Sequence, residues 1–133
     1  MYKPFHWLAL LLALGISATA QAGDLYVICH SDVQLTSADV RDMFLGEKQF
    51  AGSVKLQPAD NSAMQSAFLE KVLKMDAGKY ATAWTKKSFR DGATPPSLKG
   101  SDAEALEYVK RISGACSYVG TTPGADVVVV GRL

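Results

Sequence analysis

Three polar residues, Asp60, Asn61 and Ser62, stand where a strand-like run gives way to a helical pattern. Residues 53–57 are strand-like, and apolar residues recur at helical spacing from Met64 onward. The first N–H groups of a helix lack intrahelical partners, and the helix dipole places partial positive charge there. A strand that leads into such a terminus can bind an anion through the backbone alone. We therefore expect a ligand-binding site at Asp60, Asn61, Ser62, Ala63 and Met64.

The same residues have a simpler interpretation, in which Asp60, Asn61 and Ser62 only cap the helix. Such capping contributes about 1 kcal/mol. The two interpretations are compatible, because a capped terminus can exchange its cap for an anion. Asp60 is a fixed carboxylate that repels anions, so it favours only a ligand that carries a proton to donate.

A small basic cluster, Lys86, Lys87 and Arg90, falls at the end of a second helical pattern. Basic residues at a helix C-terminus usually complement the helix dipole and stay solvated. They could also contribute to a surface for an anion or a partner. Tyr80 and Trp84 lie four residues apart on one helix face, which favours core packing over a stacking platform.

Catalytic and metal-binding patterns find little support in the sequence. After residue 22 the only histidine is His30, and a zinc or copper site needs several nitrogen or sulfur ligands. A Ser-His-Asp set could be assembled around His30, but no G-x-S-x-G elbow is present. Paired carboxylates for acid–base work are not recognisable. We expect no enzymatic activity, no cofactor and no metal.

The first 22 residues have the composition of a signal peptide. Lys3 precedes an uncharged apolar core over residues 8–16, and Ala20-Gln21-Ala22 resembles a cleavage site. The apolar core is too short for a spanning helix, which needs about 20 residues. Lys3 is the only charged residue in this segment, so its removal takes the formal net charge from +1 to zero. We expect one exported domain over residues 23–133, with no basic excess for nucleic acid and no membrane insertion after cleavage.

Cys29 and Cys116 both lie in the expected exported domain, each within a short strand-like run. An oxidising compartment favours a disulfide between them. The alternative is a pair of buried free thiols that pack as small apolar residues. A redox function has no support, because the two cysteines do not form a C-x-x-C pair.

Alternating strand and helix patterns predict an α/β domain with a central sheet. Strands are predicted at residues 25–29, 53–57, 115–119 and 127–130, and helices are predicted to begin near Thr36, Ser62, Asp76 and Ser101. Gln65 would complete a capping box with Ser62, and Glu104 one with Ser101. Residues 127–130 form a continuous valine run typical of a strand covered on both faces.

Several of these landmarks fall together in a known pattern. Residues 35–46 resemble the L-T-x-x-E-L-x-x-I-F-L-G run of the phosphate-binding proteins of bacterial ABC importers, and residues 59–64 (A-D-N-S-A-M) resemble their A-D-G-S-G-T phosphate loop. Tyr80, Trp84, Phe89, Gly92 and residues 95–96, followed by residues 114–119, are similar to a Y-W … F-x-G-x-G-x-P-P … G-A-I-G-Y-V series. That series marks short, exported, single-lobe relatives. The resemblance covers nearly all of residues 25–120.

The resemblance implies a three-layer α/β fold, like a single lobe of a type II periplasmic binding protein, with a central mixed sheet flanked by helices. It also implies a periplasmic, non-enzymatic binding module for phosphate or a similar small oxyanion, linked to ABC-type uptake or sensing. Two features depart from the family. The arginine before the phosphate loop corresponds to Pro58, and the loop's glycine and threonine correspond to Ala63 and Met64. Asp60, Ser62 and the helix N–H groups carry over.

A second function is open, in which the chain is an envelope protein–protein interaction module that has lost ligand binding. The family's phosphate is enclosed by two lobes, whereas this chain has the length of one. The face left uncovered could then meet a partner protein. A contiguous apolar patch beside the loop would favour this function, and a wholly polar surface there would count against it.

Overall fold

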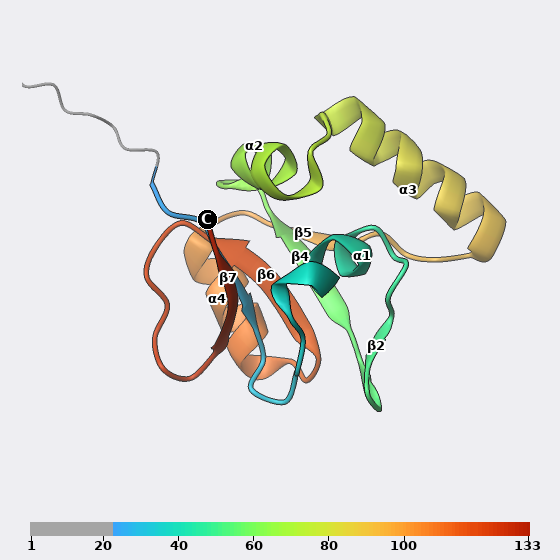
Figure 1. The fold of residues 1–133 in the computed structure, drawn as a ribbon. Helices are drawn as coiled ribbons and strands as arrows, with labels where there is room; N and C mark the ends of the chain where they lie inside the picture. Colours follow the sequence, from blue (N-terminus) through green and yellow to red (C-terminus); the bar gives the residue numbers. More distant parts are fainter. Residues whose placement is uncertain (1–22) are drawn as a thin grey trace, which may run out of the picture.

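A five-stranded mixed sheet forms the centre of the computed structural model, which describes residues 23–133 (Figure 1). The strand order is β5-β4-β6-β1-β7. The strands are β1 (Tyr26–Cys29), β4 (Gln57–Asn61), β5 (Ser97–Lys99), β6 (Ala115–Val119) and β7 (Val128–Arg132). Strands β5, β4 and β6 are mutually parallel, and β1 is antiparallel to β6 and β7. The signal peptide predicted for residues 1–22 lies outside the described residues.

Helices cover both faces of this sheet and give the predicted three layers (Figure 1). They are α1 (Val40–Phe44, preceded by a 3-10 turn at Ser37–Asp39), α2 (Gln65–Phe68, continued by the π-helical segment η2, Leu69–Leu73), α3 (Ala77–Asp91) and α4 (Asp102–Arg111). A small hairpin, β2 (Phe50–Ala51) and β3 (Val54–Lys55), precedes β4. Within residues 23–133, no helix has both the length and the apolar character needed to cross a bilayer.

Strand alternation divides the buried residues into two cores, because successive side chains of a strand point to opposite faces. Val27 and Cys29 face the core under α1, α2 and α3, whereas Tyr26 and Ile28 face the core under α4. The larger core contains an aromatic cluster in which the rings of Phe68 and Tyr118 stack at 3.9 Å between centroids. The predicted mixed α/β fold is confirmed, with α4 on one face and the other helices on the opposite face.

Helix boundaries follow the predicted capping residues in α3 and α4. The Asp76 side chain accepts a hydrogen bond from Lys79 N at 2.8 Å, and the Ser101 hydroxyl accepts one from Glu104 N at 3.2 Å. Such side chains satisfy N–H groups that have no intrahelical partner. Both helices therefore begin where the sequence predicted.

The region between residues 53 and 73 differs from the prediction. The strand of the main sheet runs over Gln57–Asn61 and includes Pro58. Pro58 is tolerated because β5 begins opposite Ala59, so no paired strand lies beside the proline on that side. The helix begins at Gln65, and the Ser62 hydroxyl donates to Gly100 O instead of closing the predicted capping box.

The environment of strand β7 also differs from the prediction. It lies at one edge of the sheet, and Val129 is 47% exposed. The prediction that the valine run is covered on both faces is therefore wrong. A continuous β-branched run reflects strand propensity, and it does not by itself distinguish a central strand from an edge.

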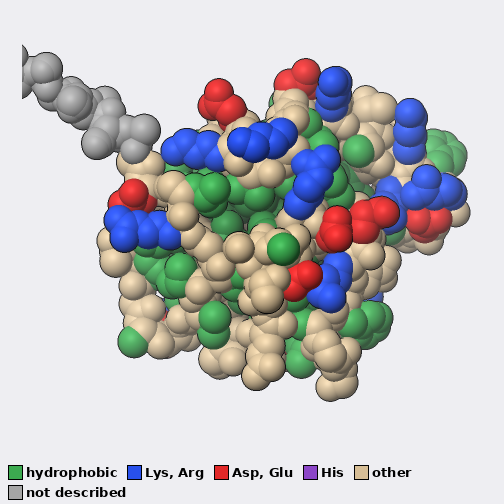
Figure 2. Space-filling view, in the orientation of Figure 1, with side chains coloured by type: hydrophobic (Ala, Val, Ile, Leu, Met, Phe, Trp, Pro, Cys, Tyr) green, Lys and Arg blue, Asp and Glu red, His purple; other side chains and the backbone are tan. Residues whose placement is uncertain are grey.

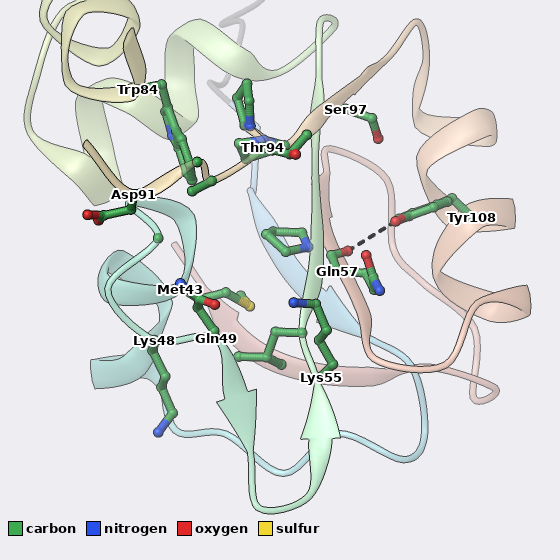
Figure 3. Close-up of a pocket in the computed structure, with 17 residues that line it drawn as sticks. Met43, Lys48, Gln49, Lys55, Gln57, Trp84, Asp91, Thr94, Ser97 and Tyr108 are labelled. Atoms are coloured by element: carbon green, nitrogen blue, oxygen red, sulfur yellow. Dashed lines mark hydrogen bonds between the residues drawn. The ribbon is translucent and has the colours of Figure 1, made fainter. Parts of the chain in front are cut away.

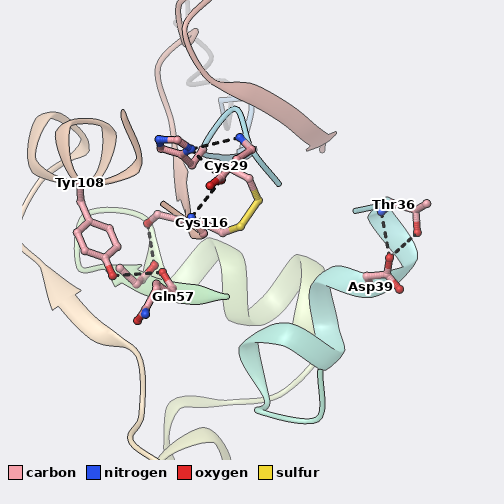
Figure 4. Close-up of a disulfide and its surroundings, with 11 residues drawn as sticks. Cys29, Thr36, Asp39, Gln57, Tyr108 and Cys116 are labelled. Atoms are coloured by element: carbon pink, nitrogen blue, oxygen red, sulfur yellow. Dashed lines mark hydrogen bonds and ion pairs between the residues drawn. A yellow bond between two sulfur atoms is a disulfide. The ribbon is translucent and has the colours of Figure 1, made fainter. Parts of the chain in front are cut away.

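A disulfide joins Cys29 and Cys116, which are register partners on β1 and β6 (Figure 4). Both cysteines are fully buried. Of the two states that the sequence left open, the structure therefore has the bridged one.

Candidate functional site

The predicted anion site lies at the edge of the sheet where the three parallel strands end. Strands β4, β5 and β6 all reach their carboxyl ends there, at Asn61, Lys99 and Val119. In open α/β sheets, ligands bind outside the carboxyl ends of parallel strands. Ser62 and Ala63 follow β4 at this edge and are exposed.

The side chains of Asp60 and Asn61 do not contribute to one site, because both residues belong to strand β4. Consecutive residues of a strand point to opposite faces. The Asp60 carboxylate accepts a hydrogen bond from Tyr80 on α3, whereas the Asn61 amide donates to Asp102 on α4. The sequence placed both residues in a loop before the helix, where this alternation would not apply.

The buried Asn61 side chain holds the loop at Ser62 and Ala63 in place through hydrogen bonds. Its side-chain nitrogen donates to Asp102 Oδ1 at 2.7 Å and to Tyr118 O at 2.9 Å, and its side-chain oxygen accepts from Ala63 N at 3.0 Å. Met64 N donates to Asn61 O at 3.0 Å. Ser62 N donates to Lys99 O at 2.8 Å, so the N–H groups of Ser62, Ala63 and Met64 all already have partners within the chain.

A carboxylate already occupies this edge of the sheet. Asp102 accepts from Asn61 through one oxygen and from Gly120 N through the other, at 3.0 Å. Ser62 donates its hydroxyl to Gly100 O at 3.2 Å. Among the described residues, no acceptor is found for the N–H groups of Gln65 and Ser66 in the first turn of α2. Both residues follow the predicted site, whose own loop amides at Ser62, Ala63 and Met64 are already bonded within the chain.

Asp60 is almost fully buried beneath α3, with 3% of its surface exposed. Its carboxylate accepts hydrogen bonds from the hydroxyls of Tyr80 at 2.8 Å and Tyr118 at 2.7 Å. Burial raises the pKa of Asp60, because loss of water disfavours the charged form, and the two tyrosine hydroxyls oppose that rise. Burial and the adjacent carboxylate also raise the pKa of both tyrosines.

The basic cluster is largely neutralised by acidic neighbours. Lys87 is 9% exposed, and its ammonium lies 2.7 Å from Glu47 and 3.4 Å from Asp91. Arg90 pairs with Asp91 at 3.1 Å. Lys86 is exposed. Figure 2 shows Lys and Arg side chains intermixed with Asp and Glu at this end of α3, so the cluster does not form a surface of single charge.

His30 belongs to a polar cluster that lacks the order of a nucleophilic triad. Its Nδ1 lies 2.8 Å from Asp32 Oδ1, and the Ser113 hydroxyl donates to the other oxygen of Asp32. A triad requires the histidine between the serine and the acid. Here Asp32 stands in the middle and also accepts from Gly114 N at 3.1 Å. Residues 23–133 contain no group of histidine, cysteine and acidic side chains suited to a metal ion.

An apolar groove lies directly beside the predicted site, between α3 and β5. It has a volume of about 490 Å³. Phe89 and Leu98, two large apolar residues at its rim, are 87% and 60% exposed. We call it the α3–β5 groove, and it is lined by Asp60, Gln65, Tyr80, Ala81, Trp84, Thr85, Ser88, Phe89, Pro95, Pro96 and Leu98. Sequence reasoning missed it, since Phe89 was recognised only near the end of a helix.

A second cavity, of about 570 Å³, lies at the opposite end of β4 (Figure 3). Its lining includes the chain on either side of the β2–β3 hairpin and the segment from Asp91 to Ser97. Its charged residues are of mixed sign, Lys48 and Lys55 with Asp91. Tyr108 donates to Gln57 O at 3.3 Å on its wall. It adjoins the amino end of β4, away from the strand ends where α/β sheets bind ligands.

Comparison with known proteins gives matches to solved structures alone. No protein-family model matches the sequence, and no curated protein is significantly similar to it. PstS from Borrelia burgdorferi matches 74% of this chain and 41% of its own, with 16% identity and a TM-score of 0.53. An ABC-type phosphate transport receptor from Vibrio cholerae matches 81% of this chain and 46% of its own, with 10% identity and a TM-score of 0.48.

This chain therefore spans less than half the length of either protein. At such low identity, the match to PstS establishes the arrangement of the backbone and leaves the ligand unassigned. The resemblance read from the sequence is confirmed at that level: the chain has the fold of one part of a PstS phosphate-binding protein, a central mixed sheet flanked by helices.

Proposed function

We propose that this chain is a non-enzymatic, exported binding module that binds another protein of the cell envelope through the α3–β5 groove. The observation that carries the proposal is the contiguous apolar surface at Phe89, Pro95, Pro96 and Leu98, directly beside the predicted loop. Exposed apolar patches on soluble domains mark interaction sites. An apolar patch beside the loop is the feature expected of a module that binds a protein partner.

The loop itself supports this choice over an oxyanion. An anion that approaches the carboxyl ends of β4 and β6 meets the Asp102 carboxylate, which bridges Asn61 and Gly120. The Asp60 carboxylate lies buried under α3 with two tyrosine hydroxyls, away from the exposed loop residues Ser62 and Ala63. The family's arginine is absent, since Pro58 holds its position. Without that cation, an anion would lose the charge-assisted hydrogen bonds that give strong binding.

Export to the periplasm is part of the proposal. The buried disulfide between Cys29 and Cys116 is typical of proteins that fold in an oxidising compartment. The composition of residues 1–22 agrees with an export signal.

Site-specific photo-crosslinking in the native host tests the proposal. A photoreactive phenylalanine analogue replaces Leu98 or Phe89 in the groove, and Val129 on the opposite sheet edge provides the control, since it is 47% exposed. We expect an adduct with one envelope protein, identified by mass spectrometry, from the two groove positions and not from Val129. Adducts that do not depend on position would overturn the proposal, and so would an adduct of twice the monomer mass.

A second candidate function is the binding of phosphate or a similar small oxyanion, linked to ABC-type uptake or sensing. The open N–H groups of Gln65 and Ser66 favour it, together with the exposed Ser62 beside them. Isothermal titration with phosphate, sulfate and molybdate tests it, with Ser62→Ala as the matched variant. Heat at millimolar ligand that Ser62→Ala reduces would favour the oxyanion, and the absence of heat would reject it.

A further inference from the structure

We propose that the α3–β5 groove takes an arginine side chain from an extended segment of the partner, with the guanidinium at Asp60 and the stem against Trp84 and Phe89. This inference rests on the proposed function, because it names the chemistry of the partner at the same groove. Three properties of the lining favour arginine: its hydrogen-bonding capacity, its acidic group and its position beside an edge strand.

Hydroxyl and indole donors in the groove have already used their hydrogens. Tyr80 donates to Asp60 at 2.8 Å, Thr85 to Ala81 O at 3.0 Å and Ser88 to Ala93 O at 2.8 Å. Trp84 Nε1 donates to Phe44 O at 3.0 Å. A hydroxyl oxygen that donates its hydrogen still has lone pairs to accept with. Apart from the Gln65 amide, the side chains lining the groove therefore offer acceptors, and a ligand must supply donors.

The lining carries one acidic group and no basic one. Asp60 is the only acid among the lining residues, and none of them is lysine, arginine or histidine. Each carboxylate oxygen of Asp60 accepts one tyrosine hydroxyl, which leaves lone pairs on both, since a carboxylate has about four acceptor sites. A cation offsets the hydration that a buried carboxylate has lost only when it also satisfies the free lone pairs with hydrogen bonds. A cationic ligand is therefore compatible with Asp60 at the bottom of the groove, and an oxyanion is not.

The walls select arginine among the cations. Tyr80 and Trp84 bring two aromatic rings from successive turns of α3, and Phe89 adds an exposed third ring near the end of the helix. Pro95, Pro96 and Leu98 form the facing side. A guanidinium is weakly hydrated, stacks on aromatic rings and carries five N–H donors, whereas an ammonium is a compact and strongly hydrated charge. Five donors also match the several acceptor oxygens of Asp60, Tyr80 and Thr85.

The position of β5 explains how such a side chain would be delivered. Within residues 23–133, strand β5 is an edge strand that pairs with β4 alone, and Leu98 is in register with Asp60. Register partners on neighbouring strands point to the same face of a sheet. An extended segment that adds to the free edge of β5 would therefore direct its residue opposite Leu98 toward the same face as Asp60, into the groove. Strand addition of this kind is a common mode of peptide recognition.

Fluorescence of Trp84 gives a direct test. In a Trp7→Phe background Trp84 is the only tryptophan, and it lines the groove. The probe is the blocked peptide acetyl-Thr-Val-Arg-Val-Thr-amide, and its control replaces arginine by citrulline, which keeps the shape and loses the charge. We expect the arginine peptide to change the emission and to bind at least tenfold more tightly than the citrulline peptide. This comparison needs no change in the groove itself.

A charge variant then locates the cation. Asp60→Asn should remove the preference for arginine over citrulline, whereas Asp91→Asn, which removes the same charge from α3 outside the groove, should keep it. Equal binding of the two peptides would overturn the arginine inference and leave the interaction module standing. Failure of both peptides to bind would also overturn the arginine inference. The crosslinks from Leu98 would then test the proposed interaction module independently.

Discussion

Asp60 and Leu98 are register partners on neighbouring parallel strands, yet Asp60 is 3% exposed and Leu98 is 60% exposed. Both side chains point to the α3 face, where Tyr80 donates a hydrogen bond to Asp60 at the bottom of the groove and Leu98 lies at its exposed rim. The contrast arises because α3 packs through a narrow stripe, in which only Tyr80, Trp84 and Lys87 are buried. The rest of its inner surface is left as the wall of the α3–β5 groove.

Burial of Asp60 predicts a specific dependence of stability on pH. Its pKa is raised in the folded protein above the usual 3.8, so the folded state binds the proton more tightly than the unfolded state. Its contribution to the free energy of unfolding is therefore fully present below 3.8 and is lost as pH rises through the raised pKa. We expect the stability of the wild type relative to Asp60→Asn to fall between acid and neutral pH.

Urea unfolding of both proteins at a series of pH values measures this difference. Asp32, Asp39, Glu47 and Asp91 have pKa values that hydrogen bonds hold below the usual range, so they act in the opposite direction. They are common to both proteins, and their effect cancels in the comparison. A difference that does not vary with pH would show that Asp60 titrates alike in the folded and unfolded chains.

Removal of the disulfide should cost much of the domain's stability. The bridge between Cys29 and Cys116 closes a loop with a sequence separation of 87. In the chain-entropy model, a loop of that size contributes about 4–5 kcal/mol through the unfolded state. We expect the double variant Cys29→Ala/Cys116→Ala to lower the free energy of unfolding in urea by this amount, and the reduced wild type to behave similarly. A loss below about 1 kcal/mol would contradict the estimate.

Gly114 and Gly92 form a matched pair for a glycine test. Both have positive φ, 79° and 69°, which disfavours any residue with a Cβ atom. A Cβ at Gly114 would meet the Lys55 carbonyl oxygen at 2.0 Å, whereas a Cβ at Gly92 meets nothing within 4 Å. We expect Gly92→Ala to cost about 1 kcal/mol from the backbone alone, and Gly114→Ala to cost about 2 kcal/mol more. Thermal unfolding of the two variants shows which one loses more stability. Equal losses of stability would contradict the close approach between residue 114 and the Lys55 carbonyl oxygen.

Phe89 should be dispensable for stability although it is a large aromatic residue. It is 87% exposed, so Phe89→Ser removes little buried surface and should change the free energy of unfolding by less than about 0.5 kcal/mol. Phe68, which is fully buried against Tyr118, provides the contrast, since Phe68→Ala should cost about 3–5 kcal/mol. Chemical denaturation measures both. A large loss from Phe89→Ser would indicate that this side chain is part of the core, not of an interaction surface.

Local patterns in the sequence determined most of the elements. Asp76 and Ser101 cap the helices that they were predicted to cap, because a capping hydrogen bond involves residues only three positions apart. The strand at Ala115–Val119 and the mixed α/β class follow from equally local features. The two cysteines left a disulfide and a pair of free thiols both open, and the register of β1 with β6 decided for the disulfide.

The tertiary structure decided the environment of the candidate site. The sequence could not show that β4 passes through Pro58 to Asn61, since a proline argues against a strand unless its neighbour is missing, and that neighbour is set by β5. That extension directs Asp60 toward α3 and Asn61 toward α4, so residues adjacent in the sequence face different layers. The α3–β5 groove likewise joins Phe89 and Leu98 across a turn. Such contacts between distant elements depend on packing, which no local pattern encodes.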